Sequence, residues 1–264
     1  MTLASRLHAG ETLFTAWSAI PDSLTVEAVA GLGFDAVTLD MQHGAHHEDS
    51  VARGIAPILQ KGRHPLVRIP VGRFDMASRA LDFGAEAVIA PMVNSVADAR
   101  AFAASMKYPP VGERSWGPGL AMPRAGKTDM QAWLESANAE TVALAMIETR
   151  AALDALDGIL AIEGIDGVFV GPSDFSIAWS EGRTIDPANE DMMGAIAKIA
   201  EKAAAANKHA AIFVLDPALV GRFSAMGYRL IALGTEAHFM AIGSKTLLDC
   251  ARQPMGSTAS KASP

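Results

Sequence analysis

The chain has 264 residues, of which half are hydrophobic, and it carries a formal net charge of -7. This composition excludes an intrinsically disordered protein, and the length allows a large buried core. The acidic balance and the lack of a long basic cluster argue against a nucleic-acid partner. No apolar run approaches the roughly 18 residues that span a bilayer, so no membrane partner is expected.

The chain ends and the cysteine content give three further expectations. The first residues lack the apolar segment of a signal peptide, and the one cysteine, Cys250, cannot form an intrachain disulfide. A cytoplasmic location is therefore expected. Residues 253–264 are small and polar, which is typical of a flexible tail, and residues 1–252 are expected to form one domain.

Short apolar runs alternate along the chain with longer stretches of helical period. The runs are continuous rather than alternating, as in parallel strands that are buried on both faces. They predict strands at residues 13–17, 36–39, 66–69, 87–90, 142–147, 167–170, 211–214 and 230–233. Helices are predicted near residues 21–31, 49–61, 76–83, 95–106, 150–160, 188–206, 217–226 and from 237 onward.

Eight strand–helix pairs in a chain of this length predict an α/β fold, a (β/α)8 TIM barrel. The alternative is an open doubly wound sheet, but no glycine-rich dinucleotide fingerprint follows the first strand. A long connection over residues 107–128 is dense in glycine and proline. A loop of this length in a compact domain is usually functional.

The active site of such a barrel lies at the C-terminal ends of its strands. Glu148 follows the fifth predicted strand and Asp174 follows the sixth. Two carboxylates at neighbouring strand ends predict a site for a hard divalent cation such as Mg²⁺ or Mn²⁺. Arg68, on the third strand, suits the stabilisation of an oxyanion. His43 follows the second strand and suits a general base, with a carboxylate such as Asp40 to orient its ring.

Each of these residue types also has a structural interpretation. A carboxylate at a strand end is often the N-cap of the next helix, and we expect this of Asp216 and Glu236. His46 and His47 are expected to be exposed. No lysine follows an apolar strand, which argues against a Schiff-base aldolase, and a G-x-S-x-G nucleophile motif is missing.

Seven stretches, taken together, resemble the HpcH/HpaI class II pyruvate aldolases, the group of 2-keto-3-deoxy-acid and 4-hydroxy-2-oxoheptanedioate aldolases. They are LDMQHG (39–44), LVRIP (66–70), ALDFGA (80–85), IAPMVNSVADA (89–99), YPPVGERSWG (108–117), MIET (146–149) and GIDGVFVGPSDFS (164–176). The resemblance runs from about residue 10 to residue 245. It implies a carbon–carbon lyase that reversibly joins a pyruvate enolate to an aldehyde, giving 4-hydroxy-2-oxo acids.

The resemblance also implies roles for individual residues. Glu148 and Asp174 would bind the divalent metal, which would be Mg²⁺, Mn²⁺ or Co²⁺, with Zn²⁺ also acceptable. His43 would be the base, with Asp40 nearby and with Asp82 supporting its basicity.

The substrates are assigned in the same way. The resemblance implies that Arg68 stabilises the enolate and that the backbone around Gly171, Pro172 and Ser173 receives the pyruvate carboxylate. It also implies a homohexamer in which the last helix packs onto, or is exchanged with, a neighbouring subunit.

Three positions depart from the commoner family pattern. Gln42 replaces a frequent glutamate, and Met146 replaces a frequent glutamine that touches substrate. The loss of this hydrogen-bonding group suggests that a substituted donor such as hydroxypyruvate is accepted. Trp116, in the unusual stretch SWGPG (115–119), is expected to shape the aldehyde pocket.

Related activities remain open from the sequence. Oxaloacetate decarboxylation uses the same enolate and is expected as a side activity. One alternative is a CoA-ester lyase of the citrate-lyase type, although no basic cluster is present for the phosphates of CoA. A non-catalytic barrel that binds a small acid is the other.

Overall fold

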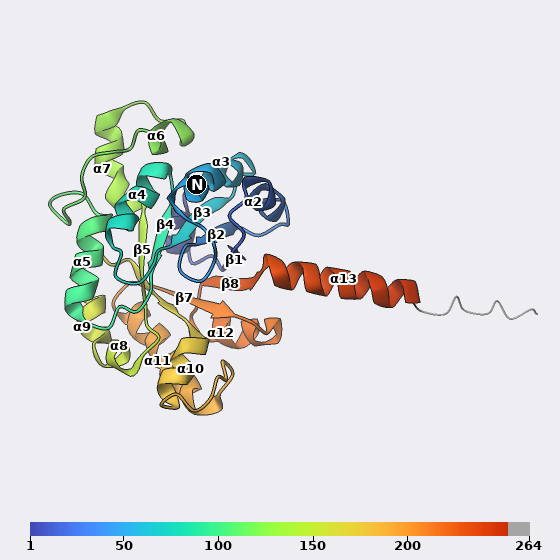
Figure 1. The fold of residues 1–264 in the computed structure, drawn as a ribbon. Coiled ribbons are helices and arrows are strands. Elements are labelled where there is room, and N and C mark those ends of the chain that lie inside the picture. Colours follow the sequence, from blue (N-terminus) through green and yellow to red (C-terminus); the bar gives the residue numbers. More distant parts are fainter. Residues whose placement is uncertain (253–264) are drawn as a thin grey trace, which may run out of the picture.

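Eight parallel strands close into a barrel in the order β1 to β8 in the computed structural model, which describes residues 1–252 (Figure 1). The predicted tail, residues 253–264, lies outside the described residues. The strands are β1 (Leu13–Ser18), β2 (Ala36–Asp40), β3 (His64–Arg68), β4 (Ala87–Ala90), β5 (Val142–Met146), β6 (Gly167–Val170), β7 (His209–Val214) and β8 (Leu230–Thr235). The predicted TIM barrel is confirmed.

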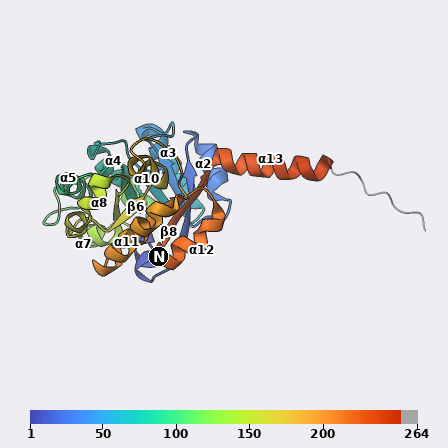
Figure 2. The ribbon, with the colours of Figure 1, turned by 90° about the horizontal axis from the view of Figure 1, so that it is seen from below.

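Helices surround this barrel and cover the outer face of its sheet (Figures 1 and 2). They are α1 (Leu3–His8), α2 (Ser23–Ala30), α3 (Glu48–Gln60), α4 (Asp75–Phe83), α5 (Val96–Met106), α6 (Ala121–Arg124), α7 (Met130–Glu140), α8 (Arg150–Asp154), α9 (Leu156–Leu160), α10 (Pro172–Trp179), α11 (Glu190–Ala205), the 3-10 turn η1 (Pro217–Leu219), α12 (Val220–Met226) and α13 (Glu236–Arg252). Helices α1, α6, α7 and α10 were not predicted from the sequence. Their signals are weak because they are short or, as in α7, bury a single residue, Ala137.

The barrel has two apolar cores, one inside the sheet and one between the sheet and the helices. The inner core includes Leu13, Leu66 and Leu144, and the buried side chains Leu3 and Leu7 of α1 join it. Helix α1 therefore closes the N-terminal end of the barrel. The C-terminal ends of the strands remain for a binding site.

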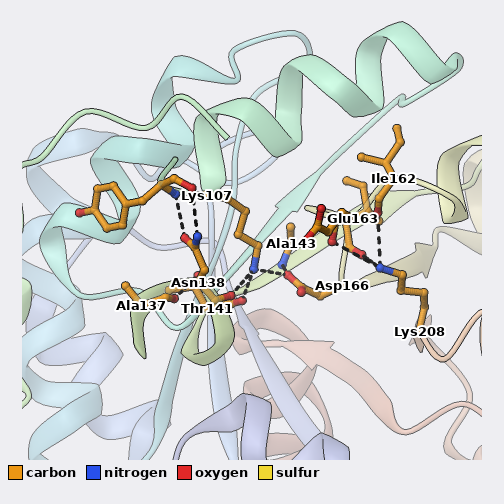
Figure 3. A network of polar contacts seen from close by, with 11 residues as sticks. Lys107, Ala137, Asn138, Thr141, Ala143, Ile162, Glu163, Asp166 and Lys208 are labelled. Carbon is orange, nitrogen blue, oxygen red and sulfur yellow. Dashed lines mark hydrogen bonds and ion pairs between the residues drawn. The ribbon is translucent and has the colours of Figure 1, made fainter. Parts of the chain in front are cut away.

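A polar network at the N-terminal ends of β5 and β6 fixes the strands that carry the predicted metal ligands (Figure 3). The buried Lys107 ammonium donates to the carbonyl oxygens of Asn138 and Thr141, at 2.7 Å each, and pairs with the Asp166 carboxylate at 2.7 Å. Asp166 in turn accepts from the backbone N–H of Ala143 at 2.7 Å. The loops that lead into both strands are thus joined through one ammonium group.

Helix α13 follows β8 directly and extends away from the barrel (Figures 1 and 2). Glu236 is its one buried residue, and Met240, Ile242, Leu247 and Leu248 expose large apolar side chains. Within residues 1–252, no helix is both long enough and apolar enough to cross a membrane.

Candidate active site

A pocket of about 260 Å³ opens at the C-terminal ends of the strands, where the active site of a TIM barrel is expected. It brings together most of the residues that the sequence analysis singled out. Its lining includes Trp17, Asp40, His43, Gly44, Arg68, Met146, Phe169, Gly171, Pro172, Ser173, Asp174, Phe213 and Thr235.

Arg68 and Asp40 form a buried ion pair between the ends of β3 and β2. The Arg68 Nε donates to Asp40 Oδ1 at 2.8 Å, and Nη2 donates to Oδ2 at 2.6 Å. The two residues are also register partners in the sheet. Burial alone would raise the pKa of Asp40, but the hydrogen bonds and charge of Arg68 outweigh burial and lower it. Asp40 is therefore an ionised carboxylate that fixes the guanidinium in one orientation.

The same carboxylate also holds the loop that carries His43. Its oxygens accept from the backbone N–H groups of Gln42 at 3.0 Å, His43 at 3.4 Å and Gly44 at 3.0 Å. The expected contact from Asp40 to the imidazole ring is not formed, because Arg68 and these three amides occupy the carboxylate. The His43 Nε2 lies instead 3.3 Å from the Gln42 side-chain nitrogen.

Glu148 is a buried carboxylate directly behind the pocket wall. Its Oε1 accepts from the backbone N–H of Met92 at 2.8 Å, and its side chain forms no ion pair with the basic residues of the described chain. Burial raises the pKa of Glu148 to about 7, and the nearby negative charge of Asp174 adds to the rise. A cation bound nearby would stabilise the ionised form of this carboxyl group and lower its pKa again.

The arrangement fits a divalent cation held by two protein oxygens. Among residues 1–252, no group of three or more histidine, cysteine or acidic side chains could hold a metal, so a cation at Glu148 and Asp174 would take its other ligands from water or substrate. A Cβ at Gly171 would lie 2.6 Å from Glu148 Oε2, and its absence leaves space beside that oxygen. Hard cations prefer such oxygen ligands and complete their coordination with water or substrate.

Aromatic and thioether side chains form the apolar part of the pocket. Trp17 packs against Phe169 and Phe213, with ring centroids 5.7 and 5.3 Å apart. The Arg68 guanidinium lies over the Trp17 ring, 4.9 Å from its centroid. Met146 is buried beside Gly171. These walls exclude water from the Arg68 guanidinium, which strengthens its interaction with a bound anion.

Three predicted site residues do not line this pocket: Glu148, which lies behind its wall at Gly171, and Asp82 and Trp116, which lie elsewhere. Asp82, on α4, pairs with Arg114 at 2.8 Å and lies next to Gly117. Burial raises the pKa of Asp82, and Arg114 only partly opposes the rise. Trp116 is 45% exposed and packs on Tyr108, with ring centroids 5.6 Å apart. Their roles toward His43 and the aldehyde stay predictions.

The other polar residues at the strand ends differ in part from expectation. Asp216 caps η1 by accepting from the backbone N–H of Ala218, as predicted. The prediction that His46 is exposed was wrong, because His46 is 5% exposed and hydrogen bonds Ser18. The prediction that Glu236 caps a helix was also wrong, since its carboxylate accepts hydrogen bonds from Ser18, at the end of β1, and from Ala19, which follows it. This contact joins residues 218 positions apart, so no local sequence pattern predicts it.

Comparisons with known proteins agree with this fold and pocket. The HpcH/HpaI aldolase/citrate lyase family matches residues 13–241. A hydroxypyruvate/pyruvate aldolase from Roseovarius nubinhibens is 34% identical over 241 residues, covering 91% of this chain and 92% of its own. A second one, from Rhizorhabdus wittichii, is 35% identical and covers 92% and 95%. The crystal structure of an HpcH/HpaI aldolase from Desulfitobacterium hafniense matches with a TM-score of 0.86, at 26% identity over 97% of this chain and 98% of its own.

The chain therefore belongs to the HpcH/HpaI aldolase/citrate lyase family. Its relatives are named as aldolases, so the prediction of a carbon–carbon lyase of the class II aldolase type is confirmed. The two alternatives, a CoA-ester lyase and a non-catalytic binding barrel, are not favoured.

Proposed function

We propose that this aldolase forms the enolate of pyruvate or hydroxypyruvate and adds it reversibly to an aldehyde, giving a 4-hydroxy-2-oxo acid. The observation that carries the proposal is the buried Glu148 carboxylate, which feels the charge of Asp174 and lies behind the wall of a pocket lined by Asp174, Arg68 and His43. The names of the relatives, hydroxypyruvate/pyruvate aldolases, support the choice of donor.

Glu148 and Asp174 would hold a divalent cation, with Mg²⁺, Mn²⁺ and Co²⁺ as the first candidates and Zn²⁺ as a further one. When bound, such a cation supplies Lewis-acid polarisation of a carbonyl oxygen. The pKa of about 7 for Glu148 places its deprotonation near neutral pH, where the metal ion and the proton compete for the same carboxylate oxygens.

Arg68 and His43 take the charge and the proton. The pair with Asp40 uses Nε and Nη2 of Arg68, which leaves Nη1 as a donor for the oxygen that becomes negative in the enolate. His43 lines the pocket and accepts a proton from the carbon next to the keto group, directly or through water. In the addition step, that carbon attacks the aldehyde, and the new alkoxide oxygen takes the proton from His43, directly or through water, which restores the base.

The donor is oriented by the wall at the start of α10. Gly171, Pro172 and Ser173 line the pocket next to Asp174, and we assign them to the carboxylate of the 2-oxo acid. Met146 presents no hydrogen-bonding group on the same side. An apolar residue here tolerates a substituent on the donor, which is the basis for including hydroxypyruvate.

The same enolate forms when oxaloacetate loses CO₂, so we propose slow oxaloacetate decarboxylation as a side activity. The cytoplasmic location expected from the single cysteine stays a prediction.

We propose that α13 packs onto a neighbouring subunit of a homohexamer. The support is its length of 17 residues, of which only Glu236 is buried, and its exposed side chains Ile242 and Leu247. Apolar side chains along one projecting helix are typical of an interface. Native mass spectrometry should give six copies for the wild type and smaller species for an Ile242→Glu, Leu247→Glu double variant. Six copies in the double variant would refute the role of α13, with Lys245→Gln as the control on the same helix.

Proton exchange of the pyruvate methyl group in D₂O tests the proposed activity. NMR should show exchange with Mg²⁺ or Mn²⁺ and none after a chelator is added, and hydroxypyruvate should also exchange. Glu148→Gln should abolish metal-dependent exchange and leave the fold intact, whereas the exposed Glu190→Gln should leave exchange unchanged. Full exchange in Glu148→Gln, or none in the wild type with any metal, would contradict the proposal.

A further inference from the structure

Glu236 lies where β8 passes into α13, and its carboxylate is buried against the loop after β1. One oxygen, Oε1, accepts from the Ser18 hydroxyl at 2.5 Å, and both oxygens accept from the backbone N–H of Ala19, at 3.1 and 2.9 Å. The residue is 3% exposed. A buried carboxylate with this many donors fixes the backbone that provides them.

The segment that Glu236 holds is in direct contact with the loop that carries His43. The Ala19 carbonyl accepts from the backbone N–H of Ala45 at 2.9 Å. A Cβ at Gly44 would lie 2.9 Å from the Ala19 Cα, so the two backbones pack together without room for a side chain. Ala19 and Gly44 both line the catalytic pocket.

A second connection runs through a side chain of the same loop. The Ser18 hydroxyl lies 3.0 Å from Nε2 of His46, and Nδ1 of His46 lies 3.2 Å from the Ser50 hydroxyl at the start of α3. Ser18 is fully buried, so this serine–histidine–glutamate cluster cannot reach a substrate and is not a second catalytic site. Glu236 is therefore connected to the His43 loop by hydrogen bonds through both Ala19 and Ser18.

We propose that Glu236 is a positioning residue for the aldolase reaction: its carboxylate clamps Ser18 and Ala19, which in turn fix the His43 loop at the pocket. The inference rests on the proposed role of His43 as the base. The loop is held from two sides, by Asp40 from the β2 end and by the Glu236 clamp from the β8 end. Glu236 accepts hydrogen bonds from Ser18, at the end of β1, and from Ala19 and Ile20 after it, whereas the proposed metal ligands follow β5 and β6.

The test is Glu236→Gln in the full-length enzyme, with Glu190→Gln as the matched control. Glu190 is exposed at the first turn of α11 and pairs with Arg222, away from the pocket. In Glu236→Gln, the amide group faces the Ala19 N–H donor and cannot replace both carboxylate oxygens. We expect kcat for metal-dependent pyruvate methyl exchange to fall roughly 10- to 100-fold, since small misplacements of a base have effects of this order.

Two further measurements separate positioning from general damage. The Mn²⁺ dissociation constant and KM should stay within about two-fold of the wild type, because β5, β6 and Arg68 set them. Hydrogen–deuterium exchange followed by mass spectrometry should show faster exchange in the peptide covering residues 41–47, and Glu190→Gln should show none. Loss of Mn²⁺ binding together with kcat would overturn the positioning role.

The outcomes also distinguish this inference from the proposed function. If the wild type shows no metal-dependent methyl exchange, the proposed function fails, while the amide exchange of residues 41–47 still decides whether Glu236 holds the loop. If the wild type is active and Glu236→Gln keeps its kcat and its amide exchange, the inference is refuted. Ser18→Ala serves as the second variant if Glu236→Gln does not fold, and it should show the same split between kcat and Mn²⁺ binding.

Discussion

The Arg68 guanidinium and the Asp40 carboxylate meet through two parallel hydrogen bonds, Nε to Oδ1 at 2.8 Å and Nη2 to Oδ2 at 2.6 Å. Asp40 also accepts from the backbone N–H of Gly44 at 3.0 Å, so one carboxylate fixes both the cation and the His43 loop. The electrophilic and the basic parts of the proposed site are therefore placed relative to each other by a single side chain.

The first prediction concerns this carboxylate. Asp40→Asn replaces one acceptor oxygen by an N–H donor, which faces either Arg68 or the loop amides and cannot satisfy both. We expect kcat/KM for pyruvate methyl exchange to fall roughly 100-fold, comparable to the loss of an oxyanion-hole donor. The exposed Asp49→Asn, on α3, is the control and should be unchanged. Activity in Asp40→Asn within a few-fold of the wild type would show that Arg68 needs no such partner.

The second prediction concerns the space beside Glu148. In Gly171→Ala, the new Cβ would lie 2.6 Å from Glu148 Oε2 and 3.0 Å from the Met146 methyl group, so the carboxylate has to move. We expect Mn²⁺ affinity, measured by isothermal titration calorimetry, to fall roughly 10- to 100-fold, as when groups that orient metal ligands are changed.

Gly194→Ala is the matched control, because no atom lies within 4 Å of a Cβ at that position on α11. This variant should bind Mn²⁺ normally and should be slightly more stable, by about 0.5 kcal/mol, since alanine is the better helix former. Equal Mn²⁺ affinities in the two variants would argue against Glu148 as a ligand.

The third prediction is the pH dependence of metal binding. The pKa of Glu148 is raised to about 7 in the metal-free protein, so the carboxyl group is largely protonated below that pH. A metal requires the ionised form and displaces the proton. The dissociation constant of Mn²⁺ should therefore rise, up to about ten-fold per pH unit, as pH falls below 7. An affinity that stays flat between about pH 5.5 and 8 would exclude a proton-linked Glu148 ligand.

The barrel and most of its pocket were predictable because both follow from local signals. Continuous apolar runs mark buried parallel strands, and chain order then places Asp40, Arg68 and Asp174 at one end of the barrel. Helix α10 was missed because the N-cap Gly171 and the first helical residues Pro172, Ser173 and Asp174 resemble a turn, although proline suits the first position of a helix.

The contacts between distant segments were not predictable in the same way. The orientation of Asp40 toward Arg68, rather than toward the His43 ring, depends on the three-dimensional placement of these side chains at the strand ends. The burial of His46 and the reach of Glu236 to Ser18 depend on how β8 closes against β1. A sequence pattern gives the strand to which a residue belongs, but these partners lie 28 positions apart, or 218 in the case of Ser18 and Glu236.

The fourth prediction concerns the Lys107 network in Figure 3, remote from the pocket. Burial lowers the pKa of Lys107, and Asp166 opposes this effect by pairing with it at 2.7 Å. Lys107→Met leaves the partly exposed Asp166 without its ion-pair partner, and the cost is at most the roughly 3–5 kcal/mol of a fully buried unpaired charge. The thermal unfolding midpoint should fall by up to about 10 °C.

Lys245→Met is the control for this variant. Lys245 is exposed and pairs with Asp249 one turn along α13, and loss of such a pair usually changes stability by less than about 0.5 kcal/mol. The kcat for methyl exchange at low temperature should be retained in Lys107→Met. A midpoint equal to that of the wild type would mean that burial of the ion pair cancels its attraction.

The last prediction concerns acid stability and His209, the first residue of β7. Burial lowers the pKa of His209 to about 4, and the neighbouring His8 and Lys208 contribute to the decrease. The unfolded chain binds a proton at this histidine below about pH 6.5, whereas the folded chain does not until about pH 4. The contribution of His209 to the free energy of unfolding should therefore fall with decreasing pH in this window, by up to about 1.4 kcal/mol per pH unit. In His209→Asn, the free energy of unfolding measured by urea denaturation at pH 7, 6 and 5 should depend less on pH than in the wild type.

The control is His47→Asn, at the exposed N-cap of α3 where asparagine is well suited, and it should keep the pH dependence of the wild type. Identical slopes in His209→Asn and the wild type would assign the acid sensitivity in this window to other groups, with His46, whose pKa is also lowered by burial, as the next to be changed.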